Sequence, residues 1–404
     1  MKVLVFGDDT GPCLAVARSL GRRGAEVHLT TQSGGGAASH SRYVNATHVL
    51  PLYVGDGSEW LRTLRQLCSE HGFALLVPTS DSSLEQLLRH RSDLRDIELA
   101  LPNEAAAACF TDKLLTRQLA EDHAVPLAEG STIELAGGIP RLARELELPV
   151  VLKRRKSYEC GDPDQKSEVR LVDTGIDLQR ALATGRFDFA ESFVPGFCRG
   201  LSVLARDGKV LVAHQHRRLN QQHSTGPGSL RISEACDPQL LEWTRKLAAA
   251  TRLTGVAMFE FRHDPRSGQT ALLEVNPRFW GSLPLAVAAG ADFPALLSLM
   301  ILDHCDPSPA IGSRPGVVKL NVESEWYSLS AAADQANGWL DRVRCIAQAA
   351  RLAFHLVWGR RIDSWATDDP VPFLIERRQL LRDLANAFRK RVGGFRLGNP
   401  QPAE

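Results

Sequence analysis

The first 105 residues alternate short apolar runs with helical patterns, and this alternation constrains the fold more than any other feature of the chain. Predicted strands occupy residues 3–6, 26–30, 74–77 and 98–101, and predicted helices occupy residues 13–20, 58–71 and 82–91. Strands that are joined in this way by helices form a parallel sheet with helices on its faces. We therefore predict a small, doubly wound α/β domain over residues 1–105.

The turn after the first strand differs from a dinucleotide-binding loop. It reads Gly7-Asp8-Asp9-Thr10-Gly11, whereas the dinucleotide fingerprint is G-x-G-x-x-G. The second strand ends in Thr30-Thr31, so no acid is placed to bind a ribose. We expect the two glycines to allow a tight turn rather than to bind a nicotinamide nucleotide.

Composition excludes several classes of protein. The 404 residues are 44% hydrophobic and 24% charged, as in globular proteins with two to four domains. With 48 basic and 47 acidic residues, the net charge of +1 provides no overall attraction for DNA or RNA, so we expect no nucleic-acid partner. The eight cysteines form no C-x-x-C pair, which favours reduced thiols in a cytoplasmic enzyme.

Residues 106–310 have a different pattern, typical of an α+β region built on hairpins. The run Pro149-Val-Val-Leu ends on Lys153, and the Asp207-Gly208 turn joins two further apolar runs. The apolar stretch 282–302 contains Asp292 and two prolines, so we predict two short buried helices and no membrane span. Residues 311–404 are predicted to be mainly helical, with long helices over 340–358 and 372–392.

The C-terminal helix predicted over residues 345–358 has a single narrow polar stripe, formed by Gln348, Arg351 and His355. Such a helix is typically buried in a core or in a dimer interface rather than laid on a membrane. A homodimer is therefore among our expectations.

A hairpin near residue 265 carries the most informative chemistry. Glu260 and Glu274 lie on two apolar strands joined by a turn, so they face each other if the strands pair. Asn276 lies two residues beyond Glu274 and points to the same face. Two carboxylates and an amide oxygen suit Mg²⁺ bound to nucleotide phosphates, and Arg278 adds a fork-shaped phosphate donor. The alternative is a solvent-facing hairpin, but its flanks, 256–259 and 271–273, are apolar.

The row formed by Glu260, Glu274, Asn276 and Arg278 resembles the metal signature of the ATP-grasp superfamily. The likeness covers roughly residues 1–305 and is greatest to the carbamoyl-phosphate-synthetase-like and biotin-carboxylase-like branch of carboxylate–amine ligases. It implies a Rossmann-like preATP-grasp domain over 1–105 and a two-subdomain ATP-grasp domain over 106–310. The helical C-terminal extension spans 311–404.

The resemblance also implies roles for further residues. Lys113 matches the lysine at the start of the first ATP-grasp subdomain, and Lys153 matches the lysine that reaches ATP. Residues 191–194 resemble the hinge strand that lines the adenine slot: Glu191, Ser192, Phe193 and Val194. Either lysine would otherwise be a solvated surface residue, and the hinge residues would otherwise be simple core.

Five more residues are expected near the substrates. In similar proteins basic residues face the acyl phosphate at the positions of Arg217 and Arg218, and we expect at least one of them to touch substrate or phosphate. His216 and Ser229 are lower-ranked candidates for substrate contact. Asp81 follows a predicted parallel strand, where ligands bind, although it is also a good helix N-cap.

Two positions depart from the family pattern. The loop after Lys153 has one glycine, Gly161, where many members have several, so phosphate contacts would come from side chains such as Arg155, Lys156 and Ser157. Where a ribose-binding acid often follows the hinge, this chain has Arg199.

Together these features predict an ATP-dependent, ADP-forming ligase. It would activate a carboxylate as an acyl phosphate and join it to an amine, with ATP and Mg²⁺, or Mn²⁺ in its place. The expected partners are a small-molecule carboxylate and an amine, amino acids among them. The alternatives are a regulatory protein with a degenerate nucleotide site and a carboxylase that activates bicarbonate.

Overall fold

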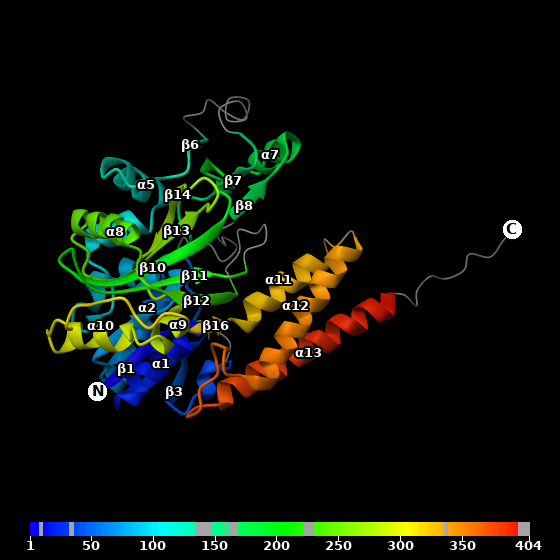
Figure 1. Cartoon of the computed structure of the whole chain (residues 1–404). Coiled ribbons are helices and arrows are strands. Elements are labelled where there is room, and N and C mark those ends of the chain that lie inside the picture. The colour runs from blue at the N-terminus through cyan, green and yellow to red at the C-terminus, as the bar shows by residue number, and fades with distance from the viewer. Residues whose placement is uncertain are drawn as a thin grey trace.

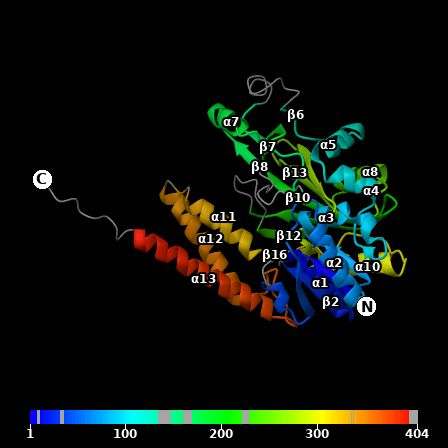
Figure 2. The ribbon, with the colours of Figure 1, turned by 180° about the vertical axis from the view of Figure 1, so that it is seen from behind.

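The structure is a computed structural model that describes residues 1–7, 11–31, 36–133, 147–158, 160, 169–220, 229–334, 336 and 338–394. It contains three sheets and a C-terminal group of helices (Figure 1). The seven-stranded sheet lies between the N-terminal domain and the four-stranded sheet, and the view from behind shows the same order (Figure 2). The predicted fold class, mixed α/β and α+β with a helical C-terminal region, is confirmed.

The N-terminal domain is a parallel sheet of five strands in the order β3-β2-β1-β4-β5. Its strands are β1 (Lys2–Phe6), β2 (Glu26–Thr31), β3 (Val44–Val49), β4 (Leu75–Pro78) and β5 (Glu98–Leu99). Its helices are α1 (Gly11–Arg22), α2 (Ser58–His71) and α3 (Asp81–Arg89), with short 3₁₀ turns at Ala38–His40 and Arg91–Leu94. Strand β3 is missing from our prediction because only alternate residues of this edge strand turn inward.

Two apolar clusters cover the two faces of this sheet. On one face, α1 packs on β1 and β2 and also against two helices within residues 283–302. On the other face, Leu4 and Phe6 meet Trp60 and Leu64 of α2. The first cluster continues into Val256 and Met258 of the large sheet, so the N-terminal domain and that sheet share a core.

The four-stranded sheet has the order β6-β9-β7-β8, with antiparallel pairing throughout. Its strands are β6 (Gly130–Thr132), β7 (Val150–Lys153), β8 (Val169–Val172) and β9 (Phe189–Ser192). The helices of this region are α4 (Glu104–Phe110), α5 (Lys113–Asp122) and α7 (Gly175–Leu182). Strand β7 is fully buried, as its apolar run predicts, so Lys153 ends in the interior.

The seven-stranded sheet follows the path β14-β13-β10-β11-β12-β16, and β15 pairs with β11. Its strands are β10 (Phe197–Arg206), β11 (Lys209–Arg218), β12 (Leu230–Glu234), β13 (Gly255–His263), β14 (Thr270–Asn276), β15 (Ala310–Ile311) and β16 (Val318–Leu320). Helices α8 (Pro238–Ala250), α9 (Leu283–Ala288) and α10 (Phe293–Leu302) belong to the same region. The last two are the short helices predicted for residues 282–302.

Polar side chains cap two of these helices. The N-cap of α5 is Asp112, whose carboxylate accepts bonds from the amides of Leu114 and Leu115. The N-cap predicted at Asp81 is wrong by one residue, because Ser80 caps α3 in a capping box with Ser83. A Ser-x-x-Ser pair satisfies both amides, which leaves the Asp81 carboxylate available for another partner.

The C-terminal region contains α11 (Val322–Asp334), α12 (Trp339–Trp358) and α13 (Val371–Gly394), which project from the body (Figure 1). Strand β16 joins the seven-stranded sheet just before α11, so this region is anchored through the sheet. Helix α12 exposes large apolar side chains within the single chain: Trp339, Leu340, Val343, Ile346, Phe354, Val357 and Trp358. In the described part of the chain, every helix is too short or too polar to cross a membrane.

Candidate active site

Strand pairing sets Glu260 of β13 directly opposite Glu274 of β14, as the hairpin predicts. This line of paired residues continues across β10 and β11, because Glu260 pairs with Gly200 of β10 and Gly200 pairs with His216 of β11. Gly200 is required here, since a Cβ at this position would run into the His216 ring. Four neighbouring strands therefore hold His216, Glu260 and Glu274 in one line across the sheet.

The two carboxylates have different partners and different pKa shifts. Burial raises the pKa of Glu260, and repulsion from Glu274 adds to this, although Arg218 donates a 2.6 Å bond to the Glu260 carboxylate. Burial also acts to raise the pKa of Glu274, but Lys113, a 3.0 Å bond from the Asn276 amide, and Lys153 outweigh it and lower the pKa. The site thus holds two acids close together in a weakly solvated setting.

Two buried lysines approach Glu274 from the neighbouring subdomain. Lys153 forms an ion pair with Glu191, and its Nζ atom lies 3.4 Å from the carbonyl oxygen of Leu273 on β14. Lys113 donates a 2.7 Å bond to Ser157, and burial lowers its pKa although Glu274 opposes this shift. Each lysine is 6% exposed, so neither is a solvated surface residue.

Arg278 joins the hairpin to the N-terminal domain. Its Nε and Nη2 atoms donate bonds of 2.7 and 2.6 Å to the two carboxylate oxygens of Asp81, and Nη2 also lies 3.2 Å from the Asn276 oxygen. Asp81 is the first residue of α3 and follows the carboxyl end of β4. The arginine thus connects the carboxyl edge of the parallel sheet to the carboxylate pair.

Cavities open on both sides of Glu274 and Asn276. One, of 160 Å³, is lined by His216, Arg218, Arg231, Met258, Glu260, Glu274, Asn276, Arg278, Trp280, Gly281 and Ser282. A narrower one is bordered by Asp81, Lys113 and Ser157. The His216 Nδ1 atom is buried without a hydrogen-bond partner among the described residues, and burial lowers the pKa of His216 well below its usual value.

Arg231 lines this cavity but was not among the residues selected from the sequence. It donates a 2.6 Å bond to the carbonyl oxygen of Gly281 and pairs with Asp363, which follows α12 in the C-terminal region. The signal in the sequence was an arginine between the apolar residues Leu230 and Ile232 of a short strand, where a buried charge needs a partner.

The structure does not bring every predicted residue to the cavity. Arg217 lies on the opposite face of β11 from His216 and Arg218, where it donates a 2.7 Å bond to Glu234. Ser229 is buried beside Glu325 of α11 and bonds to that carboxylate. Neither residue lines the cavity that holds the carboxylate pair.

The predicted hinge, residues 191–194, begins at the end of β9, an inner strand of the four-stranded sheet. The Glu191 carboxylate pairs with Lys153 and, at 3.1 Å, with Arg117. The amides of Ser192 and Phe193 donate to the carbonyl oxygens of Glu129 and Pro149. Val194 is buried beside Ala128 and Ala271, and the Phe193 ring lies under the guanidinium of Arg262.

The loop after β7 is described only in part. Arg155 pairs with Asp112 at 2.5 Å, and together with Arg154 and Lys156 it lines a separate cavity of 1040 Å³ between α3, α4 and α5. Of the three proposed phosphate donors, Ser157 accepts a bond from the Lys113 amine through its side chain, whereas Arg155 contacts Lys113 through its backbone carbonyl oxygen. Gly161 falls outside the described residues.

Comparison with known proteins agrees with this geometry. A sequence model of the family described as "ATP-grasp in the biosynthetic pathway with Ter operon" matches residues 193–323, the segment that contains the carboxylate pair. Solved structures with the same fold include an L-amino acid ligase from Bacillus licheniformis, at 18% identity and a TM-score of 0.58, over 74% of each chain.

Two further structures are similar. The biotin carboxylase domain of the 2-oxoglutarate carboxylase from Hydrogenobacter thermophilus, solved with MgADP and bicarbonate, has 17% identity and a TM-score of 0.62, over 78% of this chain and 73% of that one. The N5-carboxyaminoimidazole synthetase from Staphylococcus aureus, solved with ADP, has 15% identity and a TM-score of 0.59, over 79% and 82%.

The fold combines a five-stranded parallel sheet with a seven-stranded and a four-stranded sheet, and the carboxylate pair lies on two strands of the seven-stranded sheet. Residues 193–323 thus match an ATP-grasp family model, and the chain shares the fold of these structures, in agreement with the resemblance found in its sequence.

Proposed function

We propose that this protein is an ATP-dependent, Mg²⁺-dependent ligase that activates a carboxylate as an acyl phosphate and transfers the acyl group to an amine. The observation that carries the proposal is the facing pair Glu260 and Glu274, with Arg218 and Arg278 beside it. Two buried like charges destabilise a fold unless a cation offsets them. Arg218, Lys113 and Lys153 offset part of this repulsion, and a metal ion between the carboxylates would offset more.

The residues fit Mg²⁺ together with nucleotide phosphates. Glu260, Glu274 and Asn276 offer hard oxygen donors at one cavity. Burial, and to a smaller extent repulsion from Glu274, raises the pKa of Glu260, and a dication bound there would oppose both effects. Mg²⁺ bound there would supply charge neutralisation for the phosphates. Mn²⁺ accepts the same donors and is the expected substitute.

The nucleotide would lie between the four-stranded and seven-stranded sheets. Lys153 and Lys113 are buried beside Glu274 and would meet the phosphates, while the hinge would border the adenine. Because the Ser192 and Phe193 amides already donate within the chain, the adenine amine would bind a hinge carbonyl and the ring nitrogen would use the amide of Val194. Glu191 is held by Lys153 and Arg117 and would position the lysine rather than contact adenine.

In the first step, a carboxylate oxygen of the substrate attacks the γ-phosphorus, and the bond to the β–γ bridging oxygen breaks to release ADP. In the second, the amine nitrogen attacks the acyl carbon, the carbon–oxygen bond breaks, phosphate leaves and the nitrogen loses a proton. Arg218 and Arg278 would bind the transferring group and its carboxylate acceptor, so catalysis rests on alignment and charge stabilisation. His216 is neutral at pH 7 and would contribute a hydrogen bond to the substrate rather than act as a base.

The test is nucleotide turnover against a panel of carboxylates with hydroxylamine as a trapping nucleophile. We expect ADP and phosphate, and a hydroxamate whose mass identifies the acid. Replacing hydroxylamine with amino acids then identifies the amine. AMP with pyrophosphate would contradict the acyl-phosphate mechanism, and bicarbonate-dependent turnover without a hydroxamate would favour the carboxylase alternative.

We propose further that the exposed apolar face of α12 is the surface that a homodimer would cover. Trp339, Val343, Ile346 and Val357 recur at helical spacing and are 52–72% exposed in the single chain. The similar 2-oxoglutarate carboxylase domain was solved as a dimer. Sedimentation should give a dimer that Ile346→Glu converts to a monomer, whereas Glu323→Gln leaves it intact; a monomeric parent chain would contradict this proposal.

A further inference from the structure

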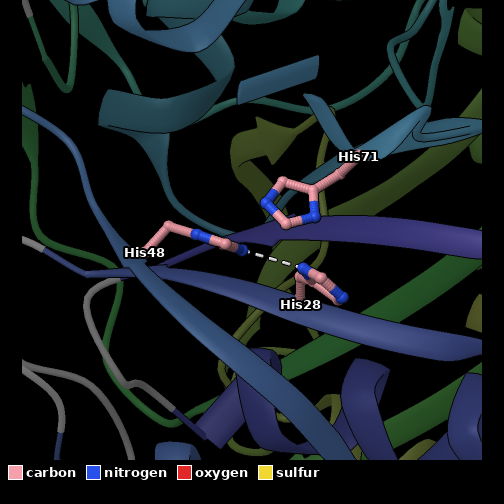
Figure 3. A group of neighbouring side chains, drawn as sticks. All are labelled: His28, His48 and His71. Carbon is pink, nitrogen blue, oxygen red and sulfur yellow. Dashed lines mark hydrogen bonds between the residues drawn. The ribbon is translucent and has the colours of Figure 1, made fainter. Parts of the chain in front are cut away.

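Three histidines from separate elements converge on the face of the N-terminal sheet that carries α2. His28 lies in β2, His48 in β3 and His71 at the last position of α2. Their rings point toward one another (Figure 3). His28 is buried and the other two are half-buried, so the cluster is screened on one side and open to solvent on the other.

The spacing of the ring nitrogens suits a metal ion. The Nδ1 atom of His28 lies 2.8 Å from the Nε2 atom of His48. One nitrogen from each of the three rings lies within 4.8 Å of the other two. In a tetrahedral site with metal–nitrogen bonds of about 2.0–2.1 Å, ligand nitrogens are about 3.3 Å apart. The observed spacings fall on both sides of that value, so small side-chain rotations would bring the nitrogens to it.

A carboxylate behind His28 fixes which nitrogen faces the cluster. Glu26 lies 3.1 Å from the Nε2 atom of His28, and it also pairs with Lys2 at 3.6 Å. A neutral His28 that donates its Nε2 proton to Glu26 directs the Nδ1 lone pair toward His48 and His71. Metal-binding histidines commonly have such an outer carboxylate.

His71 is the member that a simple hydrogen-bonded pair does not explain. The bond between His28 and His48 satisfies two ring nitrogens without it. Among the described residues, the His71 ring makes no hydrogen bond and packs against three rings: His28 at 5.0 Å, His48 at 4.8 Å and Phe73 at 5.5 Å between centroids. Phe73 also packs edge-on against His28 and supplies an apolar wall.

We propose that His28, His48 and His71 form a Zn²⁺ site with Glu26 as the outer carboxylate. Imidazole nitrogens suit Zn²⁺ and related transition metals rather than Mg²⁺, which prefers oxygen. A water molecule would complete the tetrahedral coordination on the open side.

The proposed site is separate from the nucleotide site. His71 precedes β4, whereas Asp81, which contacts Arg278, follows the carboxyl end of the same strand. The zinc would therefore tie β2, β3 and α2 together and stabilise the N-terminal domain. This inference does not depend on the proposed ligase function.

Zinc binding to the metal-free full-length chain, measured by calorimetry and by elemental analysis after dialysis, tests the site. We expect one Zn²⁺ per chain and a rise in melting temperature on loading. His71→Gln should weaken binding at least tenfold and is the preferred variant, because this ring makes no hydrogen bond to another described residue. Glu26→Gln should weaken it by about 10–100-fold, whereas His40→Gln, an exposed histidine of the same domain, should bind normally.

Cobalt provides a second measurement that is independent of stability. Co²⁺ in a tetrahedral nitrogen site gives visible absorption that an octahedral surface complex does not, and His71→Gln should lose it. A parent chain that binds no Zn²⁺, or one whose binding is unchanged by both His71→Gln and His48→Gln, would overturn the proposal. The cluster would then be a stack of rings with a packing role.

Discussion

Arg278 and Asp81, 197 residues apart in the chain, form an ion pair with two hydrogen bonds. This pair connects the end of the β13–β14 hairpin to the N-terminal domain. Both guanidinium–carboxylate bonds are short, at 2.7 and 2.6 Å. Burial and the Arg278 charge act on Asp81 in opposite directions, and the net effect lowers the pKa of Asp81. An incoming phosphate or carboxylate would thus meet an arginine that is already oriented by a neighbouring domain.

A double-mutant cycle on this pair should give a coupling free energy of about 1–2 kcal/mol, as expected for a bidentate contact between parts of one fold. Arg278→Lys keeps the charge but loses the fork, so it should slow turnover more than it weakens ATP binding. Asp81→Asn should slow turnover less than Arg278→Lys does, because the Arg278 guanidinium is still present. Urea unfolding and steady-state kinetics of both single variants and the double variant measure these effects; additive free energies of unfolding would contradict the coupling.

Glu274→Gln should lower the rate of ADP formation by about a thousandfold, which corresponds to about 4 kcal/mol. Glutamine preserves the size of the side chain and can still accept the bond from Asn276, so the free energy of unfolding should change little. The exposed Glu242→Gln is the matched control and should retain full activity. Turnover near the parent rate in a folded Glu274→Gln protein would remove the carboxylate pair from the mechanism.

The hairpin could be predicted because its information is local. The lengths of the two strands and the turn between them fix the register, and the apolar flanks show that Glu260 and Glu274 point inward. The choice between Arg217 and Arg218 required pairing across non-sequential strands. Glu260 pairs with Gly200 and Gly200 with His216, so Arg218, two residues from His216, shares its face. No local pattern in the sequence predicts the register of β13, β10 and β11.

Contacts between domains were likewise absent from the sequence pattern. Asp81 is a favourable N-cap type, and only the structure shows that Ser80 has this role while Asp81 binds Arg278. The histidine cluster was missed for the same reason. Its members come from β2, β3 and α2, and β3 was not predicted. Local periodicity predicts elements, whereas these sites depend on how the elements are packed.

Lys153→Met should weaken ATP binding at least tenfold and lower the free energy of unfolding by about 3 kcal/mol. The substitution leaves the buried Glu191 carboxylate with Arg117 as its remaining cation, and breaking a buried ion pair is costly. Lys209→Met, at an exposed strand end, is the control and should change neither quantity. Calorimetric titration with ATP measures the affinity, and urea unfolding measures the free energy of unfolding, so the two effects are separated. Normal ATP affinity in Lys153→Met would show that this lysine only pairs with Glu191.

Mg-ATP should raise the melting temperature, whereas NADH should not. A ligand that binds only the native state stabilises it by about 2.7 kcal/mol at a hundred times its dissociation constant. The first strand-to-helix turn lacks the dinucleotide fingerprint. The buried lysines lie outside the N-terminal sheet, Lys153 at the end of β7 and Lys113 at the start of α5. Differential scanning fluorimetry with each nucleotide, with and without Mg²⁺, measures the shift. A rise with NADH and none with Mg-ATP would reverse the assignment of the nucleotide.

His214 should make the protein acid-sensitive between about pH 6.5 and pH 4. Burial lowers the pKa of His214 to about 4, while its Nδ1 atom contacts the Ser313 hydroxyl at 2.6 Å. An unfolded histidine has a pKa near 6.5, so in this range the unfolded chain binds more protons than the native one. The stabilising effect is therefore complete above pH 6.5 and declines as the pH falls toward 4.

The size of this decline is about 2 kcal/mol between pH 7 and pH 5 for His214 alone. His214→Asn keeps a polar group near Ser313 but cannot titrate, so its free energy of unfolding should fall by about 2 kcal/mol less than that of the parent chain over the same interval. His304→Asn, at an exposed position, should follow the parent. Urea unfolding at half-unit steps of pH gives both curves. Parallel curves for the parent and His214→Asn would mean that this histidine is not the neutral, buried group that its environment indicates.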